Sequence, residues 1–331
     1  MQKKSLGRIA ALSLMLLAFL ALPVDARETR YLTGNAADVS PKLNGPAFDF
    51  GGGGSDIKEA FQSLINEIRG CASCATKLDV VVLRSSGADG YNSFFYALDG
   101  VDSVETLVIT NREDSNDEGV VKTIKNAEII FFAGGDQCNY VRYFKGTKIE
   151  DAIKHVYSKG GGIGGTSAGY AIQTEFVYDG CEGSTRSNEA LSDPYHKSIS
   201  FTYDFLTWPH FENSFADTHF VARDRMGRLM AFIARQIQEK KASRVLGIGI
   251  NEKTSLVINK NGIARVMGEG PVYLVLGDHK PEVCKPGVAL TFTRFKIWRA
   301  LKNETVNLRN MPSSGYYLIS VDNGKLSADP Y

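Results

Sequence analysis

Three short apolar runs alternate with helical stretches, and this alternation constrains the fold more than any other feature of the chain. Residues 78–84, 104–110 and 127–136 are rich in valine and isoleucine, as are strands buried on both faces of a parallel sheet. Helical periodicity precedes the first run, in residues 57–68, and follows the last. Glycines stand at the strand ends, and one such end leads into Ser167. The sequence therefore predicts an α/β fold with a doubly wound, mostly parallel sheet flanked by helices.

The two ends of the chain differ from this central pattern. Residues 1–26 have the pattern of a signal peptide, residues 27–270 carry the strand and helix alternation, and residues 271–331 are polar with short β-like pieces. We therefore expect a leader, one α/β domain and a small β-rich C-terminal extension.

The leader is predicted from charge and length. Lys3, Lys4 and Arg8 precede an apolar run of 14 residues at 9–22, and Ala26 stands where a signal peptidase would cleave. A bilayer span needs about 20 apolar residues, so this run is too short to serve as an anchor. We expect the mature protein to be secreted or periplasmic.

Composition narrows the range of partners. The chain has 331 residues, of which 43% are hydrophobic and 23% charged, as in ordinary globular proteins. Its net charge is +1, and without the leader's net of +2 it is −1. A near-neutral balance argues against nucleic acid or an anionic membrane as partner.

Five cysteines remain in a chain that we expect to be exported, so at least one has no partner within the chain. Cys71 and Cys74 are spaced for a small disulfide. The alternative, half of a zinc site, lacks a second pair of ligands. We expect Cys138 to be a buried free thiol and leave the pairing of Cys181 and Cys284 open.

Ser167 stands in the pentapeptide GTSAG, where a strand turns into a helix. Such a turn presents a serine hydroxyl at the top of the sheet and directs the next amide toward a developing oxyanion. The alternative is a tight structural corner, because glycine tolerates backbone angles that other residues avoid.

A serine nucleophile needs a base and an orienting carboxylate. The favoured base is His219, because it opens a charged segment at an element boundary. His196 and His210 remain candidates. We expect a structural role for His155, in a predicted helix, and place His279 in a predicted turn. The candidate carboxylates are Glu252, at the end of an apolar strand, and Glu175, Glu182 and Glu189 in a long excursion at 174–215.

Residues 219–240 have the periodicity of an amphipathic helix. In such a helix Arg225 and Arg228 would share a face, with Arg223 nearby. This group is either a solvated basic face or a clamp for substrate carboxylates.

Four separated segments resemble one known family. They are FFAGGDQ (131–137), GGIGGTSAGYAIQ (161–173), DTHFVARDRMGRL (217–229) and GIGINEKTSLVI (247–258). Together they resemble the cyanophycinase family of serine peptidases, relatives of aspartyl dipeptidase with a class I glutamine-amidotransferase-like fold. The resemblance covers residues 51–258. Tyr170, Thr218 and Asn251 depart from the residues common in that family.

The resemblance implies a role for each matching residue. It implies Ser167 as nucleophile, His219 as base and Glu252 as the orienting acid. It implies an oxyanion hole formed by the amides of Gly135, Asp136 and Ala168. The residues that it places in or behind the substrate pocket are Gln137, Asp217, Arg223, Arg225 and Arg228.

The resemblance also implies an activity. Family members hydrolyse cyanophycin (multi-L-arginyl-poly-L-aspartate) to β-Asp-Arg dipeptides, with no metal or organic cofactor. Two alternatives stay open, an exopeptidase for other Asp-containing or isoaspartyl peptides and a non-catalytic binding protein on the same scaffold. A glutamine amidotransferase is disfavoured because that chemistry uses a cysteine at the turn. A homodimer is possible, since dimers are the commonest assembly.

Overall fold

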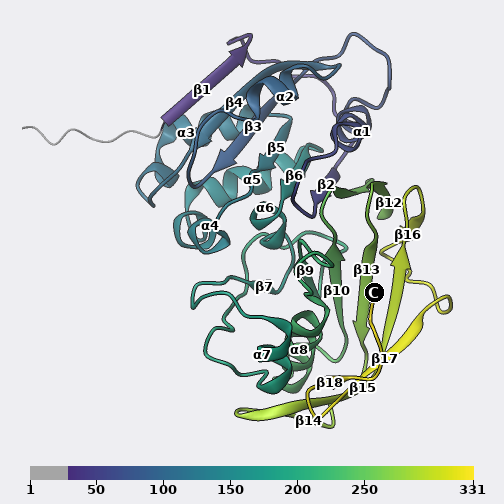
Figure 1. Cartoon of the computed structure of the whole chain (residues 1–331). Coiled ribbons are helices and arrows are strands. Elements are labelled where there is room, and N and C mark those ends of the chain that lie inside the picture. The colour runs from purple at the N-terminus through teal and green to yellow at the C-terminus, as the bar shows by residue number, and fades with distance from the viewer. Residues whose placement is uncertain (1–28) are drawn as a thin grey trace, which may run out of the picture.

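Two β-sheets meet near the middle of the protein (Figure 1). The computed structural model describes residues 29–331, so the predicted leader and its cleavage position lie outside the described residues. In the described part, one sheet has the order β1 (Thr29–Gly34), β4 (Val101–Val108), β3 (Leu78–Arg84), β5 (Ile129–Phe132), β6 (Gly162–Thr166), β2 (Ala47–Gly51), β11 (Thr254–Ile258), β12 (Ile263–Gly268) and β16 (Thr305–Asn307). The second has the order β18 (Lys325–Leu326), β17 (Tyr317–Asp322), β15 (Val288–Ala300), β13 (Val272–Gly277), β10 (Val245–Ile250) and β9 (Ser214–Asp217), with β14 (Val283–Lys285) paired to β15.

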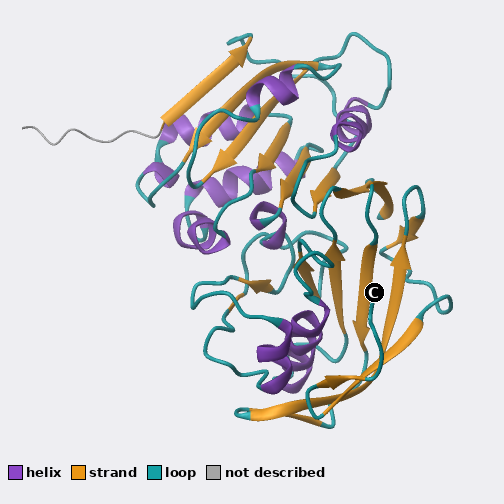
Figure 2. Cartoon of the chain, viewed as in Figure 1, coloured by secondary structure: helices purple, strands orange, loops and turns teal. Residues whose placement is uncertain are grey.

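The first sheet is parallel at its centre. Strands β4, β3, β5, β6 and β2 run parallel, whereas β1 and the β11–β12–β16 edge are antiparallel. Helices cover both faces (Figure 2). They are α1 (Lys58–Arg69), α2 (Asn92–Tyr96), α3 (Glu118–Asn126), α4 (Gln137–Phe144) and α5 (Lys148–Ser158), with a short 3₁₀ turn at Asp114–Asn116.

Side chains of β3 point alternately to the two faces of the first sheet, and apolar side chains lie on both faces. Val80 and Val82 pack into one buried cluster with the apolar side chains of α1, and Val81 and Leu83 pack into another with those of α3 and α5. A strand that is apolar on both sides must bury both faces. The predicted doubly wound α/β class is confirmed.

The remaining elements of the described chain are three helices and two short strands that form a separate two-stranded sheet. They are α6 (Ala168–Ala171), β7 (Val177–Tyr178), α7 (Ser187–Ser192), β8 (Phe201–Thr202) and α8 (Met226–Gln238). Helix α8 packs on β10 and β13 and buries its apolar face there. Strand β13 lies beyond residue 270 and pairs with β10, which lies before it, so the second sheet runs across the predicted domain boundary. The division into two domains stays a prediction.

The helix predicted for residues 219–240 is wrong at its beginning. The helix starts at Met226, and Arg225 is its N-cap residue. Left-handed backbone angles at His219 (φ 48°) and Asp224 (φ 46°) are incompatible with a helix through this segment. Arg225 therefore lies in the preceding turn.

The cysteine predictions have mixed outcomes. Cys71 and Cys74 form the predicted disulfide. The prediction that Cys138 is a free thiol is wrong, because Cys138 is bonded to Cys181, 43 residues further along the chain. Among the residues described, Cys284 is the free cysteine, and it is buried.

No helix within residues 29–331 has both the length and the apolar character that a bilayer crossing requires.

Candidate active site

Ser167 follows β6 on a sharp turn into the four-residue helix α6. Its backbone has φ 51° and ψ −119°, a sparsely populated conformation typical of functional turns. The glycines of the motif make the turn possible. A Cβ on Gly165 would lie 2.6 Å from the carbonyl oxygen of Gly169, and a Cβ on Gly169 would lie 2.1 Å from that of Phe132. The GTSAG motif is therefore a close-packed elbow with its serine at the carboxyl end of a parallel strand, where sites gather in this architecture.

His219 and Glu252 meet Ser167 from the second sheet. Strand β9 leads to His219 and the parallel strand β10 leads to Glu252. The Ser167 hydroxyl lies 2.8 Å from Nε2 of His219, and Nδ1 of His219 lies 2.6 Å from Oε1 of Glu252. If Nδ1–H donates to the carboxylate, Nε2 is left free to accept the serine proton. The two sheets thus bring together the geometry of a nucleophile, a base and an orienting acid.

The three other candidate acids lie elsewhere. Glu175 accepts a hydrogen bond from the amide of Asn213, Glu189 accepts one from the amide of Arg186, and Glu182 is exposed. The carboxylate of Glu252 is the one that reaches His219.

A glycine loop at residues 51–54 holds these groups, and our sequence analysis assigned it no role. The carbonyl oxygens of its first three residues accept hydrogen bonds from the amides of Ser167, His219 and Lys253, at 3.0, 2.7 and 2.9 Å. Its third residue, Gly53, lies under the imidazole ring: a Cβ there would be 2.4 Å from Cε1 of His219. The signal that could have revealed it is the run of four glycines directly after an apolar strand.

Replacing Gly53 by alanine should reduce activity by about 10²-fold or more, because a displacement near 1 Å of a reacting group costs that much. Gly53 also has φ +93°, so alanine adds backbone strain. Gly315→Ala is the matched control, since Gly315 has φ +78° and nothing within 4 Å of its Cβ position. Thermal unfolding of both variants measures the cost of the backbone strain. Steady-state kinetics measures the loss of activity caused by displacing the imidazole. Equal activity in the two variants would contradict a role for Gly53 in holding the imidazole.

Three backbone amides were predicted to form the oxyanion hole. Strands β5 and β6 are neighbours, so Gly135 and Asp136, which follow β5, lie beside the serine turn. A Cβ on the adjacent Gly134 would lie 3.6 Å from that of Ser167. Within residues 29–331, the amides of Gly135, Asp136 and Ala168 have no protein acceptor. A well-placed amide donor contributes about 3–4 kcal/mol to stabilising an oxyanion; the oxyanion role of these three stays a prediction.

Burial and positive charge set the protonation state of His219. Burial lowers its pKa below the ordinary histidine value, and Arg223 and Arg225 lower it further, against the opposing effect of Glu252. The hydrogen bond from His219 keeps the pKa of Glu252 low. A neutral imidazole beside an ionised carboxylate is the state that a general base requires.

The pH dependence should follow from these charges. The neutral imidazole exists above its pKa, so the acid limb of kcat/KM should lie below the ordinary histidine pKa. In Arg223→Gln the imidazolium loses a repelling neighbour, its pKa rises, and the acid limb should move to higher pH. Arg186→Gln is the control, because Arg186 is not among the charges that shift His219. An acid limb that stays in place in Arg223→Gln would contradict the assignment of this limb to His219.

Asp217, Arg225 and Arg228 form a buried ion cluster behind the site. Asp217 is 3% exposed and accepts from Nε and Nη2 of Arg228, itself 4% exposed. Arg225 donates to Asp217 at 3.3 Å and to the carbonyl oxygen of Thr218 at 2.8 Å. These side chains therefore fix the turn that carries His219. A role of Arg225 and Arg228 in binding substrate carboxylates stays a prediction.

A pocket of about 350 Å³ lies beside this cluster. Two arginines that line it, Arg186 and Arg223, are exposed and have no side-chain partner among the residues that the structure describes. Gln137, the remaining predicted pocket residue, begins α4 and contacts Gly180, just before the segment that forms the pocket wall. The full lining is Ser184, Thr185, Arg186, Ser187, Asn188, Arg223, Asp224, Arg225 and Arg228.

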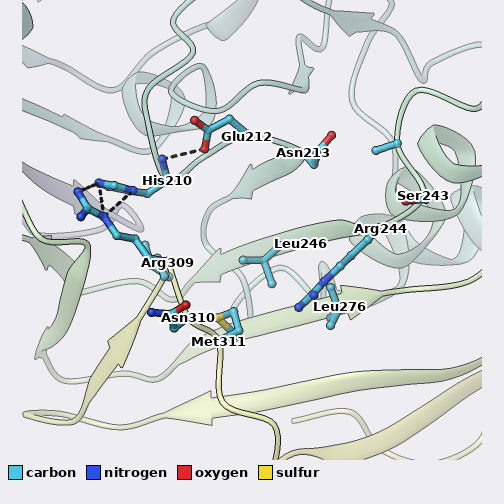
Figure 3. A pocket seen from close by; sticks show the side chains of 12 residues that line it. His210, Glu212, Asn213, Ser243, Arg244, Leu246, Leu276, Arg309, Asn310 and Met311 are labelled. Atoms are coloured by element: carbon cyan, nitrogen blue, oxygen red, sulfur yellow. Dashed lines mark hydrogen bonds between the residues drawn. The ribbon is translucent and has the colours of Figure 1, made fainter.

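The other histidines do not form such a site. His155 is exposed on α5, His279 contacts Asp278, and His196 contacts Ser198 at 2.7 Å. Figure 3 shows His210 against Arg309 in a larger hollow of about 780 Å³ that contains none of the predicted catalytic residues.

Residues 29–331 contain no group of three or more His, Cys, Asp or Glu side chains arranged to hold a metal ion.

Comparison with known proteins places the chain in a family. A sequence model described as peptidase family S51 matches residues 87–266, more than half of the chain. The chain belongs to peptidase family S51. The matched range contains Ser167, His219 and Glu252, whereas the glycine loop at residues 51–54 lies outside it.

Sequence similarity to individual proteins agrees with the assignment to family S51. A cyanophycinase of Synechococcus elongatus is 29% identical over 177 residues, which are 53% of this chain and 50% of that protein. A cyanophycinase of Geminocystis herdmanii is 25% identical over 232 residues, 68% of this chain and 79% of that protein. The chain thus spans about half the length of the first of these relatives.

A solved structure supports the fold. The crystal structure of a peptidase from an acI-B1 actinobacterium matches with a TM-score of 0.53 and 18% identity, over 80% of this chain and 98% of that one. At 18% sequence identity, this structural similarity supports the fold of the S51 chain and carries no conclusion about its activity.

Proposed function

We propose that this S51 chain is an exported serine peptidase that hydrolyses cyanophycin to β-Asp-Arg dipeptides. The observation that carries the proposal is the contact between the hydroxyl of Ser167 and the imidazole of His219, with Glu252 on the far side of the ring. The similarity to cyanophycinases supports the choice of substrate. The signal peptide predicted at residues 1–26 supports export to the periplasm or the medium.

The chemistry follows the geometry. The oxygen of Ser167 attacks an aspartyl carbonyl carbon while Nε2 of His219 takes its proton. The oxyanion forms beside the amides of Gly135, Asp136 and Ala168. The C–N bond then breaks, the leaving nitrogen receives the proton from His219, and the acyl group stays on Ser167. Water, deprotonated by the same imidazole, releases the acyl group and restores the serine.

The basic pocket supports an acidic or carboxylate-bearing substrate. Each arginine attached to the aspartate backbone of cyanophycin carries a free carboxylate. Arg186 and Arg223 are exposed in the lining of this pocket and have no ion-pair partner within residues 29–331. Guanidinium groups bind carboxylates in a bidentate manner.

The experiment that tests this proposal is incubation of the purified mature protein with cyanophycin, followed by mass analysis of the products. The expected product is the β-Asp-Arg dipeptide, absent when Ser167→Ala is used. A panel of α-aspartyl and isoaspartyl peptides run in parallel tests the alternative substrates. Cleavage of the panel with no action on cyanophycin would overturn the substrate assignment while leaving the peptidase assignment in place.

A further inference from the structure

One wall of the basic pocket comes from a partly exposed segment outside both large sheets. The segment at residues 179–188 follows β7 and ends at the start of α7. It contributes residues 184–188 to the pocket, whose lining also includes Arg223 on the turn after His219. The position of this segment therefore sets the distance between Arg186 and the rest of the pocket.

A disulfide joins this segment to the loop that carries the predicted oxyanion amides. Cys181 is bonded to Cys138, which stands two residues after Asp136 at the beginning of α4. Next to the disulfide, Gly180 rests on the side chain of Gln137, with its Cβ position 3.2 Å from Nε2. The pocket wall and the oxyanion loop are thus covalently connected across 43 residues of chain.

Hydrogen bonds orient the segment on either side of the disulfide. The carboxylate of Asp179 accepts from the amide of Cys181 at 3.0 Å and from the hydroxyl of Thr202 at 2.9 Å. The hydroxyl of Tyr178 accepts from the amide of Thr185 at 3.0 Å. These contacts hold the segment to β7 and β8, whereas the disulfide fixes it against α4.

We propose that the Cys138–Cys181 disulfide is a positioning element of the substrate pocket, which holds Arg186 at a fixed distance from the oxyanion amides. The inference rests on the proposed peptidase function and deepens it. Neither cysteine touches the reacting atoms, so the effect acts on substrate binding. Without the bond, the segment keeps its hydrogen bonds to β7 and β8 but loses its link to α4. Part of its ordering then falls to the substrate, and that cost weakens binding.

The test is the double variant Cys138→Ser/Cys181→Ser. We expect KM for cyanophycin to rise about tenfold while kcat stays within about threefold, the signature of lost ground-state binding. The matched control is Cys71→Ser/Cys74→Ser, which removes the other disulfide, formed between residues three apart after α1. Its KM should not change. An unchanged KM in the first variant, or equal rises in both, would overturn the proposal.

A second variant keeps the disulfide and covers the case in which the double variant folds poorly. Arg186→Gln should raise KM about tenfold with kcat preserved, whereas Arg244→Gln, an exposed arginine of the separate hollow in Figure 3, should leave KM unchanged. An unchanged KM in Arg186→Gln would also overturn the proposal.

Amide hydrogen exchange gives a readout that does not depend on activity. Exchange in residues 182–188 should accelerate in Cys138→Ser/Cys181→Ser and stay unchanged in the control pair. A wild-type protein that hydrolyses nothing would remove the proposed function, whereas unchanged exchange would remove the positioning role of the disulfide. The two failures are therefore distinguishable.

Discussion

Replacing Ser167 by alanine should lower kcat by a factor of roughly 10⁵ to 10⁶, because loss of the nucleophile disables the whole triad. The hydroxyl lies 2.8 Å from Nε2 of His219 at the end of a close-packed elbow. Serine already places a Cβ in this backbone conformation, so alanine adds no atom to the turn. The fold should therefore persist. The measurements are product formation from cyanophycin and thermal unfolding of both proteins.

Ser198 provides a matched control for this substitution. Its hydroxyl also contacts a histidine, His196, at 2.7 Å, but no carboxylate completes that pair among the described residues. Ser198→Ala should keep full activity. If Ser167→Ala is active, or if Ser198→Ala is the inactive variant, Ser167 is not the nucleophile.

Replacing Glu252 by glutamine should lower kcat by roughly 10³ to 10⁴, the cost of holding the imidazole in the wrong tautomer. An amide group that donates to Nδ1 of His219 moves the ring proton to Nε2, which then cannot accept the serine proton. The side chain of Glu252 is 38% exposed, so water can partly take the place of the carboxylate. KM should change little, because Glu252 lies on the far side of the ring from Ser167.

The control is Glu175→Gln, at another of the carboxylates that the sequence left as candidates. Its side chain accepts from the amide of Asn213 and does not contact His219. Its kcat should stay within about threefold of that of the native protein. A larger loss in Glu175→Gln than in Glu252→Gln would move the third triad role to Glu175.

The local sequence pattern was sufficient to predict the first sheet and the sharp turn at Ser167. Valine-rich runs such as residues 78–84 must be buried on both faces, and that requirement implies helices on both sides. The GTSAG pentapeptide combines a strand end with glycines at the two positions where a Cβ would clash. Both conclusions need only neighbouring residues, which is why the sequence supports them.

Features that depend on distant parts of the chain were harder to predict. His219 reaches Ser167 because β9 and β10 belong to a second sheet, and no local pattern encodes that meeting; the family resemblance supplied it. Periodicity extended α8 back to residue 219 because the side chains continue the pattern, although the backbone at Asp224 is left-handed. The Cys138–Cys181 pairing also depends on the tertiary fold.

Labelling with a fluorophosphonate probe, followed by peptide mapping, tests the central claim most directly. A nucleophilic serine beside a neutral imidazole should form one adduct per chain, located on Ser167. The adduct should be absent in Ser167→Ala and strongly reduced in His219→Ala. Labelling of another serine, or a catalytically active protein whose Ser167 stays unlabelled, would contradict the account.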